Sequence, residues 1–291
     1  MSREWLTKEK TCKKMEEGRE AAQECEMNLH SIPWGLSKTG LTDVGDVLTL
    51  SRMLGPNWLS CSIMNDLMDL LQAKLGEETE FRFKHTWLTP LLQDAFKEDG
   101  SAYDREVQFT WIHETAEDMM KMGKTVVTYT NVNDNHWVFL GINALTQTIY
   151  FGDPFEKVIP KEVEDVYQRW GEEMGIGKCT VKEISVGKQA DGVNCRMYVH
   201  TGAANFVLPG MYNLATSSMV NIAQMKWFSK LAGRITRMVC IILLDTSLID
   251  EVASSRWMNL MNVRTSQIQS LKPVVWHIQV SSSDPKIAST H

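Results

Sequence analysis

The chain has 291 residues, of which 43% are hydrophobic and 23% charged, and its formal net charge is −6. A chain of this length and balance can bury a sizeable core, as one large domain or two small ones. Its basic residues are spread along an acidic chain, which excludes the charge pattern of a nucleic-acid-binding protein. The longest apolar run, MVCIILL at 238–244, is far shorter than the roughly 20 residues of a membrane-spanning helix. We therefore expect neither a nucleic-acid nor a membrane partner.

The chain is charged from its third residue and begins without the apolar stretch of a secretory signal. Its six cysteines are scattered, without the C-x-x-C spacing of a zinc site or a redox motif. Free thiols are typical of an intracellular protein, so we expect a location in the nucleus or the cytoplasm and neither a metal nor a cofactor. Residues 1–40 are expected to be a charged N-terminal extension and linker.

Within the main domain, the first regular element predicted is a helix within residues 58–75, whereas residues 1–26 are interpreted as a solvated helix or a disordered lead-in. The apolar residues within 58–75 recur at spacings of four, three and four, which is the period of a helix with one buried face. These residues are Met64, Met68, Leu71 and Leu75. A second helix is predicted to end at Gly123, a residue type that commonly terminates helices.

Three short runs rich in β-branched and aromatic residues follow, at 125–131, 136–143 and 148–155. The turn-forming VNDN and the short ALTQ separate them, which predicts consecutive antiparallel strands of one sheet. The segment VEDVYQRWGEEMG is then predicted to be a helix, and residues 179–186 a fourth strand.

Two helices are predicted toward the C-terminus. The first begins at Cys195 and ends before Pro209. The second places four apolar residues on one face: Val220, Ala223, Trp227 and Leu231. We place the main domain at 41–248 and a C-terminal extension with a loose tail at 249–291.

Three of the predicted elements carry a reactive side chain at one end. His136 begins a strand, Asp153 closes the next one, and Cys195 heads a helix. A cysteine nucleophile needs a base that holds it as a thiolate, and that base needs a carboxylate that fixes its tautomer. The positive end of a helix dipole also favours a thiolate. Gln189, six residues before Cys195, could donate its amide N–H to a developing oxyanion.

Each of these residues also has a simpler interpretation. His136 could be a turn residue beside a buried Trp137, Asp153 the turn residue of GDP, and Cys195 a core residue. His200 follows Cys195 by five positions but lacks the second ligand pair that a zinc site needs. The joint occurrence of the three reactive residues at element ends favours the catalytic interpretation.

The sequence around these residues forms a longer pattern. NWLSCSIMNDLMDLL is followed by NHWVFLGIN, TIYFGDPF and QADGVNC, in that order, within about residues 58–208. This pattern resembles the ubiquitin-like-protein-specific protease family, the SUMO and sentrin cysteine proteases of the adenovirus-protease-like clan. The resemblance implies an α+β fold of the papain-like cysteine protease type. In such a fold a central, mostly antiparallel sheet is flanked by helices, and the nucleophile lies at a helix N-terminus.

The resemblance also implies a reaction and its residues. His136, Asp153 and Cys195 correspond to the catalytic triad, and Gln189 to an oxyanion-hole donor. The reaction is hydrolysis of the peptide or isopeptide bond after the C-terminal Gly-Gly of a ubiquitin-like modifier, with a SUMO-type modifier as the first expectation. The partners implied are this modifier and its conjugates.

Two tryptophans and two departures complete the comparison with the family pattern. Trp58 and Trp137 match aromatic residues that cover a narrow tunnel for the Gly-Gly terminus of the substrate, although ordinary core packing is the simpler interpretation. Cys61 replaces the usual acidic residue after Trp-Leu-x. Arg196 replaces the usual glycine after the nucleophile, where its bulk could obstruct the scissile carbonyl or its side chain could point to solvent.

Three alternatives remain open at the level of sequence. A protein of the same fold could be an endopeptidase or an acyltransferase. A chain blocked by Arg196 would be a module that binds a ubiquitin-like protein without cleaving it. Finally, the motifs could coincide by chance in a structural protein, in which case Cys195 would react as an ordinary thiol.

Overall fold

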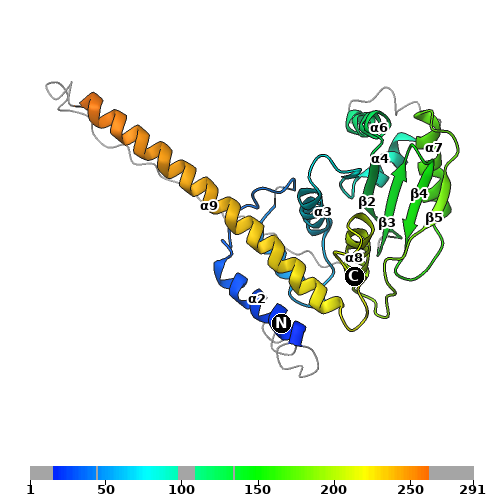
Figure 1. Ribbon diagram of the computed structural model, residues 1–291, viewed down its shortest axis with the longest axis horizontal. Helices are drawn as coiled ribbons and strands as arrows, with labels where there is room; N and C mark the ends of the chain where they lie inside the picture. Colours follow the sequence, from blue (N-terminus) through cyan, green and yellow to red (C-terminus); the bar gives the residue numbers. More distant parts are fainter. Residues whose placement is uncertain (1–15, 44, 98–108, 134, 262–291) are drawn as a thin grey trace, which may run out of the picture. The chain divides into compact units, whose positions relative to one another are not determined.

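The computed structural model describes residues 16–43, 45–97, 109–133 and 135–261, with side chains up to residue 242. The first part of the predicted N-terminal extension and the end of the predicted tail therefore lie outside the described residues. The elements in chain order are α2 (Glu16–Ser31), η1 (Val47–Met53), α3 (Cys61–Leu75), β1 (Phe81–Phe83), α4 (Leu88–Ala95), α6 (Thr110–Met122), β2 (Thr125–Val132), β3 (His136–Asn143), β4 (Thr148–Gly152), α7 (Lys161–Glu173), β5 (Thr180–Glu183), α8 (Cys195–Val207) and α9 (Val220–Met261) (Figure 1).

The strands form one sheet in the order β1-β2-β3-β4-β5. The three consecutive strands predicted from the sequence are confirmed, because β2, β3 and β4 pair in antiparallel fashion. The predicted fourth strand, β5, pairs with β4 in parallel, and the short β1 pairs with β2 in parallel. α7 lies between β4 and β5 in the chain, and parallel neighbours need a crossover connection of this kind. The fold is α+β, and its sheet is mixed, with an antiparallel centre and parallel edges.

Side chains along β2 and β3 alternate between two apolar clusters, as expected for strands with both faces buried. One cluster contains Val127, Tyr129, Trp137 and Phe139 together with residues of α2, α3, α8 and α9. The other contains Val126, Val138, Leu140 and Ile142 together with residues of α4, α6 and α7. Trp137, beside His136, thus faces the side of the sheet on which α8 packs (Figure 1).

The helix headed by Cys195 is central to this arrangement. α8 contacts both β3 and α3, and every residue from Cys195 to Ala204 is buried. A helix that is buried all round has little freedom to shift, because each of its faces is packed against another element. The position of the first residue of α8 is therefore set by the core.

The N-terminal helix α2 belongs to the same core. Ala21, Ala22 and Cys25 pack in the cluster that contains α3 and α8. Burial raises the pKa of the Cys25 thiol to about 12, and this thiol donates a hydrogen bond to the carbonyl oxygen of Met225 at 3.2 Å. The part of the predicted extension that follows Glu16 is thus folded against the main core, while the domain boundaries at 41 and 248 stay predictions.

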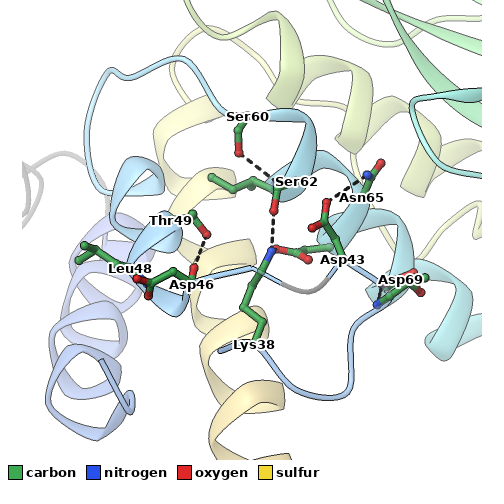
Figure 2. Close-up of polar contacts among 12 residues, drawn as sticks. Lys38, Asp43, Asp46, Leu48, Thr49, Ser60, Ser62, Asn65 and Asp69 are labelled. Carbon is green, nitrogen blue, oxygen red and sulfur yellow. Dashed lines mark hydrogen bonds and ion pairs between the residues drawn. The ribbon is translucent and has the colours of Figure 1, made fainter. Parts of the chain in front are cut away.

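Lys38 fixes the segment before α3 to that helix (Figure 2). Its Nζ donates to Asp66 Oδ2 at 2.7 Å and to Ser62 Oγ at 2.6 Å, and the side chains of the Lys38–Asp66 pair are fully buried. A second contact lies one turn further along, where the backbone N–H of Thr42 donates to Asp69 Oδ2 at 2.6 Å. These bonds connect the chain before α3 to the helix itself. We call Lys38, Ser62 and Asp66 the α3 anchor.

The chain from Ile242 onward forms a second compact unit, of which the helical backbone up to Met261 and the side chain of Ile242 are described. Among the described residues, none of the helices combines the length and the apolar character needed to cross a bilayer.

Candidate active site

Cys195 lies at the first position of α8. The preceding residue, Asn194, is the N-cap, and its side chain makes no capping hydrogen bond. The first backbone N–H groups of a helix have no acceptor within the helix, and the helix dipole makes this end positive. Only 3% of the surface of Cys195 is exposed. The candidate nucleophile therefore lies buried at the positive end of a helix dipole.

The loop before Cys195 is organised by Asp191. Its Oδ1 accepts hydrogen bonds from the backbone N–H groups of Val193 at 2.9 Å and Asn194 at 2.8 Å, and its Oδ2 accepts from the side-chain amide of Asn194 at 3.0 Å. Burial would raise the pKa of Asp191, but these hydrogen bonds together lower it. The carboxylate thus holds the turn that leads into α8.

His136 and Asp153 come from the facing ends of β3 and β4. His136 is the first residue of β3, and Asp153 follows the last residue of β4. His136 Nε2 and Asp153 Oδ1 are 2.8 Å apart, and the two side chains are 9% and 4% exposed. Because β3 and β4 are antiparallel neighbours, the first residue of β3 and the last residue of β4 lie at the same end of the strand pair.

The pKa of His136 is raised to about 9. Burial acts to lower it, but the hydrogen bond and the charge of Asp153, together with the nearby sulfur of Cys195, outweigh burial. Nδ1 of His136 is buried and makes no hydrogen bond with a described residue. One ring nitrogen is therefore held by Asp153, and the other remains available on an imidazole close enough to Cys195 for the two to interact.

Phe155 adds a further contact to this pair. Its ring stacks on the imidazole of His136 with 4.7 Å between centroids, and its backbone N–H donates to Asp153 Oδ1 at 2.6 Å. The turn after β4 thus positions both the carboxylate and the imidazole. The sequence analysis missed this role of Phe155, although its place two residues after an Asp-Pro turn is the signal that an Asx turn would give.

Gln189 lies in the loop before Cys195, and its side-chain amide donates hydrogen bonds to Asp191. Its backbone N–H donates to the carbonyl oxygen of Pro154 at 2.8 Å, which joins the loop before Cys195 to the end of β4. Its side-chain Nε2 donates to the carbonyl oxygen of Asp191 at 2.6 Å and to Asp191 Oδ1 at 3.2 Å. Its buried Oε1 has no hydrogen-bond partner among the described residues. The predicted oxyanion donor is near the nucleophile, with its amide turned toward Asp191.

Trp58 and Trp137 are brought together by Arg196. The guanidinium carbon of Arg196 lies 5.1 Å from the ring centroid of each tryptophan, over both ring faces. Trp58 is 41% exposed, whereas Trp137 is 1% exposed, so one indole lies at the surface and the other in the core. The expectation that Arg196 could point to solvent is wrong, because this residue is only 6% exposed. The aromatic faces attract the cation and hold it in the interior.

The six predicted site residues come from the start of β3, the turn after β4, the loop before α8, the first residue of α8 and the segment before α3. Contacts connect them: His136 with Asp153 and Cys195, Gln189 with Pro154, and Arg196 with both tryptophans. Asp191 and Phe155 join them as residues that the sequence analysis did not single out. Asp191 could have been found from its place at the start of DGVN, since aspartate in such a position commonly bonds the backbone two residues on. The catalytic roles of His136, Asp153, Cys195 and Gln189 and the substrate-binding roles of the two tryptophans stay predictions.

His200 has a structural environment instead. Its Nδ1 is 2.9 Å from the hydroxyl of Tyr129, its ring packs on Trp227, and burial lowers its pKa to about 3. Among the described residues, no three side chains of His, Cys, Asp and Glu lie close enough together to hold a metal ion.

One family model matches part of the chain. The model of the family described as "Ulp1 protease family, C-terminal catalytic domain" matches residues 57–172. This stretch contains Trp58, His136 and Asp153 and ends before Cys195. A comparison with curated protein sequences gives no match. The resemblance that the sequence motifs indicated is confirmed.

Solved structures share the fold at low sequence identity. The SUMO protease Ulp1 with its catalytic cysteine oxidised to a sulfenic acid has a TM-score of 0.56 at 13% identity, over 72% of this chain and 93% of its own. The C-terminal Ulp1 protease domain in complex with Smt3, the yeast ortholog of SUMO, gives 0.55 at 14% identity, over 72% and 93%. The Ulp1-like SUMO protease catalytic domain of Chaetomium thermophilum gives 0.54 at 14%, over 74% and 88%. The fold is Ulp1-like, α+β and consistent with a papain-like cysteine protease, as predicted.

Proposed function

We propose that this protein is a cysteine peptidase that hydrolyses the peptide or isopeptide bond after the C-terminus of a ubiquitin-like modifier, with a SUMO-type modifier as the first candidate. The observation that carries the proposal is the His136–Asp153 pair at 2.8 Å beside a cysteine at a helix N-terminus. The Ulp1-like fold supports it, as does the complex of the similar Ulp1 domain with Smt3.

In this proposal Cys195 and His136 act as an ion pair. A His136 pKa of about 9 means that the imidazole is protonated at neutral pH, which favours a thiolate on the neighbouring Cys195. Asp153 fixes the ring through Nε2, so that Nδ1 carries the proton to be transferred. The division of roles between the two ring nitrogens follows from the single hydrogen bond to Asp153.

The chemistry then proceeds in two balanced steps. The Cys195 thiolate attacks the carbonyl carbon, the C–N bond breaks, and His136 gives its proton to the leaving amine, which leaves a thioester on Cys195. Water next attacks the thioester, His136 takes a proton from it, and the carboxylate product leaves as the thiolate reforms. In this proposal the backbone N–H groups of the first residues of α8 stabilise the oxyanion in both steps.

Gln189 can contribute to that oxyanion only by a change of partners. Both donor contacts of its amide currently go to Asp191. We propose that the longer of the two, at 3.2 Å, is exchanged for the oxyanion when substrate binds. The exchange leaves the 2.6 Å bond to the Asp191 carbonyl in place as a pivot.

A thiolate nucleophile must stay reduced, so we propose that the protein works inside the cell, in the nucleus or the cytoplasm. The proposed partners are the ubiquitin-like modifier and its conjugates. No nucleic acid, membrane, metal or cofactor takes part in the proposed reaction.

The test is covalent capture. The protein is incubated with SUMO, ubiquitin and related modifiers that carry a C-terminal electrophile, and the intact mass is measured. We expect one adduct, lost in Cys195→Ala and kept in Cys61→Ala, which removes an exposed cysteine that also begins a helix. An adduct that persists in Cys195→Ala, or a folded protein that captures none of the modifiers, would contradict the proposal.

One observation favours a second function, that of a module which binds a ubiquitin-like protein without cleaving it. Arg196 lies over both Trp58 and Trp137, the two residues proposed to bind the substrate terminus. In that case a modifier without an electrophile would bind, while Cys195 would stay unlabelled by the electrophilic form. Arg196→Gly would then create labelling that the unmodified protein lacks.

A further inference from the structure

Arg196 is a buried cation to which the described residues offer no acceptor at Nε or Nη1. Its Nε and Nη1 have no hydrogen-bond partner among the described residues. Guanidinium groups that are removed from water normally pair with a carboxylate or with carbonyl oxygens, because an unpaired buried charge is costly. Within the part of the chain that the structure describes, no carboxylate forms an ion pair with this guanidinium.

The indole rings of Trp58 and Trp137 explain how the buried charge of Arg196 is tolerated, but they do not supply hydrogen-bond acceptors. Trp58 and Trp137 attract the cation through their ring faces at 5.1 Å. A ring face, however, does not replace the oxygen acceptors for which the five N–H groups of a guanidinium are built. Arg196 is thus held in place by aromatic contacts, while none of the described residues uses the donor capacity of its Nε and Nη1.

Positive and negative groups both lie at the helix end that carries Arg196. The residue follows Cys195 at the N-terminal end of α8, where the helix dipole adds positive charge. His136, with its raised pKa, adds a further positive charge beside Cys195 at neutral pH. Asp153 pairs with that imidazole, and Asp191 accepts from the backbone N–H of Asn194 at the start of α8, so Arg196 is the cation of this region for which the described residues supply no carboxylate partner. An anionic group is the ligand that such a place favours.

We propose that Arg196 is a specificity-determining residue that binds a carboxylate of the substrate next to the scissile bond. The planar fork of a guanidinium matches the two oxygens of a carboxylate, which would supply the acceptors that Nε and Nη1 lack. Trp58 is 41% exposed and Trp137 is 1% exposed, so the Trp58 side of Arg196 is nearer to the surface, and in this proposal the carboxylate approaches from that side. The inference rests on the proposed function, since it names the substrate feature that the same site selects.

The carboxylate can come from two sources: an acidic side chain near the scissile bond, or the new C-terminus of the cleaved modifier. Four short peptides of otherwise identical sequence separate them. One pair ends in Gly-Gly, as the free acid and as the amide. The other pair, both amides, ends in Asp-Gly and Asn-Gly. Binding is measured by fluorescence polarisation on the Cys195→Ala protein, so that no turnover interferes.

We expect the carboxylate member of at least one pair to bind about tenfold or more tightly than its neutral partner, as for a charge-assisted pair in a buried place. The preference should vanish in Cys195→Ala with Arg196→Gln. It should persist with Arg237→Gln, which removes an exposed arginine on α9. A preference in the first pair identifies the product terminus, and one in the second pair identifies an acidic side chain.

Equal binding of acid and neutral peptides overturns the proposal, and so does a preference that survives Arg196→Gln. Binding of neutral peptides that rises in Arg196→Gly also overturns it, because Arg196 would then act only as an obstruction. Circular dichroism checks the folding of each variant, and Arg196→Lys, which keeps the charge, should retain part of the preference. Because binding is measured without the nucleophile, a failure of the proposed function would appear separately, as the absence of Cys195-dependent capture.

Discussion

Lys38 and Arg196 are two cations removed from water, and the protein treats them in opposite ways. Lys38 has no exposed side-chain surface and donates to Asp66 and Ser62. Arg196 has two aromatic faces and no oxygen acceptor among the described residues. A buried cation that is paired fixes one part of the chain to another, as the α3 anchor does. A buried cation that is unpaired can still donate hydrogen bonds to a ligand.

The same contrast extends to the neighbours of each cation. Four residues of the candidate site have buried polar atoms without a hydrogen-bond partner among the described residues: His136 Nδ1, Trp137 Nε1, Gln189 Oε1, and Nε and Nη1 of Arg196. In the α3 anchor the corresponding atoms are bonded, with the exception of Asp66 Oδ1. Unsatisfied polar groups are costly, so a cluster of them is expected where a ligand completes the bonding. This is the pattern of a site rather than of a scaffold.

The largest effect is expected when the paired cation is removed. Lys38→Met leaves the Asp66 carboxyl buried without its cation, which should lower the free energy of unfolding by about 3–5 kcal/mol at pH 8. Burial raises the pKa of Asp66 to about 7, although the hydrogen bond and charge of Lys38 lower it. Without Lys38 the carboxyl binds a proton more tightly, so the loss should be smaller at pH 5, where it is protonated in both proteins. Urea denaturation at the two pH values measures this.

The control replaces both partners of the anchor. Lys38→Met with Asp66→Leu removes the two buried charges together and should recover most of the lost stability. If Lys38→Met alone were as stable as the unmodified protein at pH 8, the anchor would not be a structural element, and the contrast with Arg196 would fail.

A second large effect is expected when Asp153, the partner of the His136 imidazole, loses its charge. Asp153→Asn removes the charge that raises the pKa of His136, so this pKa should fall from about 9 toward or below 6.5, since burial acts in the same direction. The rate of Cys195 capture at pH 7.5 should then fall about a hundredfold or more. The rate measured against pH tests this, with Asp165→Asn, an exposed carboxylate on α7, as control.

The same variant has a consequence for stability. A raised histidine pKa contributes stability that is complete below the unfolded value near 6.5 and is lost as the pH rises through about 9. Asp153→Asn should flatten this part of the stability profile. An unchanged capture rate together with an unchanged profile would show that Asp153 does not control His136.

A smaller effect is expected from the loop before the nucleophile. Asp191→Ala removes the acceptor for Val193, Asn194 and Gln189 and should lower kcat/KM toward a modifier substrate by roughly tenfold, since a displaced positioning group costs catalysis more than folding. Asp191→Asn keeps one acceptor oxygen, so its kcat/KM should lie between that of the unmodified protein and that of Asp191→Ala. The separation of kcat from KM is the informative readout, because a merely structural role would not lower kcat in the folded protein.

These residues also show where sequence reasoning reaches and where it stops. Local patterns set the ends of helices and strands. The sequence could therefore predict the positions of His136, Asp153 and Cys195, because each lies at such an end. The parallel pairing of β5 depends on the crossover through α7, a matter of topology. The position of the Arg196 side chain could not be predicted, because it depends on Trp58 and Trp137, which are distant in sequence and meet only in the folded chain.

The smallest effect is expected when the unpaired cation is removed. Arg196→Met takes away two unsatisfied donors and a costly buried charge, and it also loses the attraction of two indole faces. These contributions oppose each other, so the free energy of unfolding should change by no more than about 1 kcal/mol. Urea denaturation beside Lys38→Met makes the comparison direct. A loss as large as that of Lys38→Met would mean that Arg196 is held for the sake of the fold, and the contrast between the two buried cations would disappear. A small change would leave ligand binding as the reason for keeping an arginine next to the nucleophile.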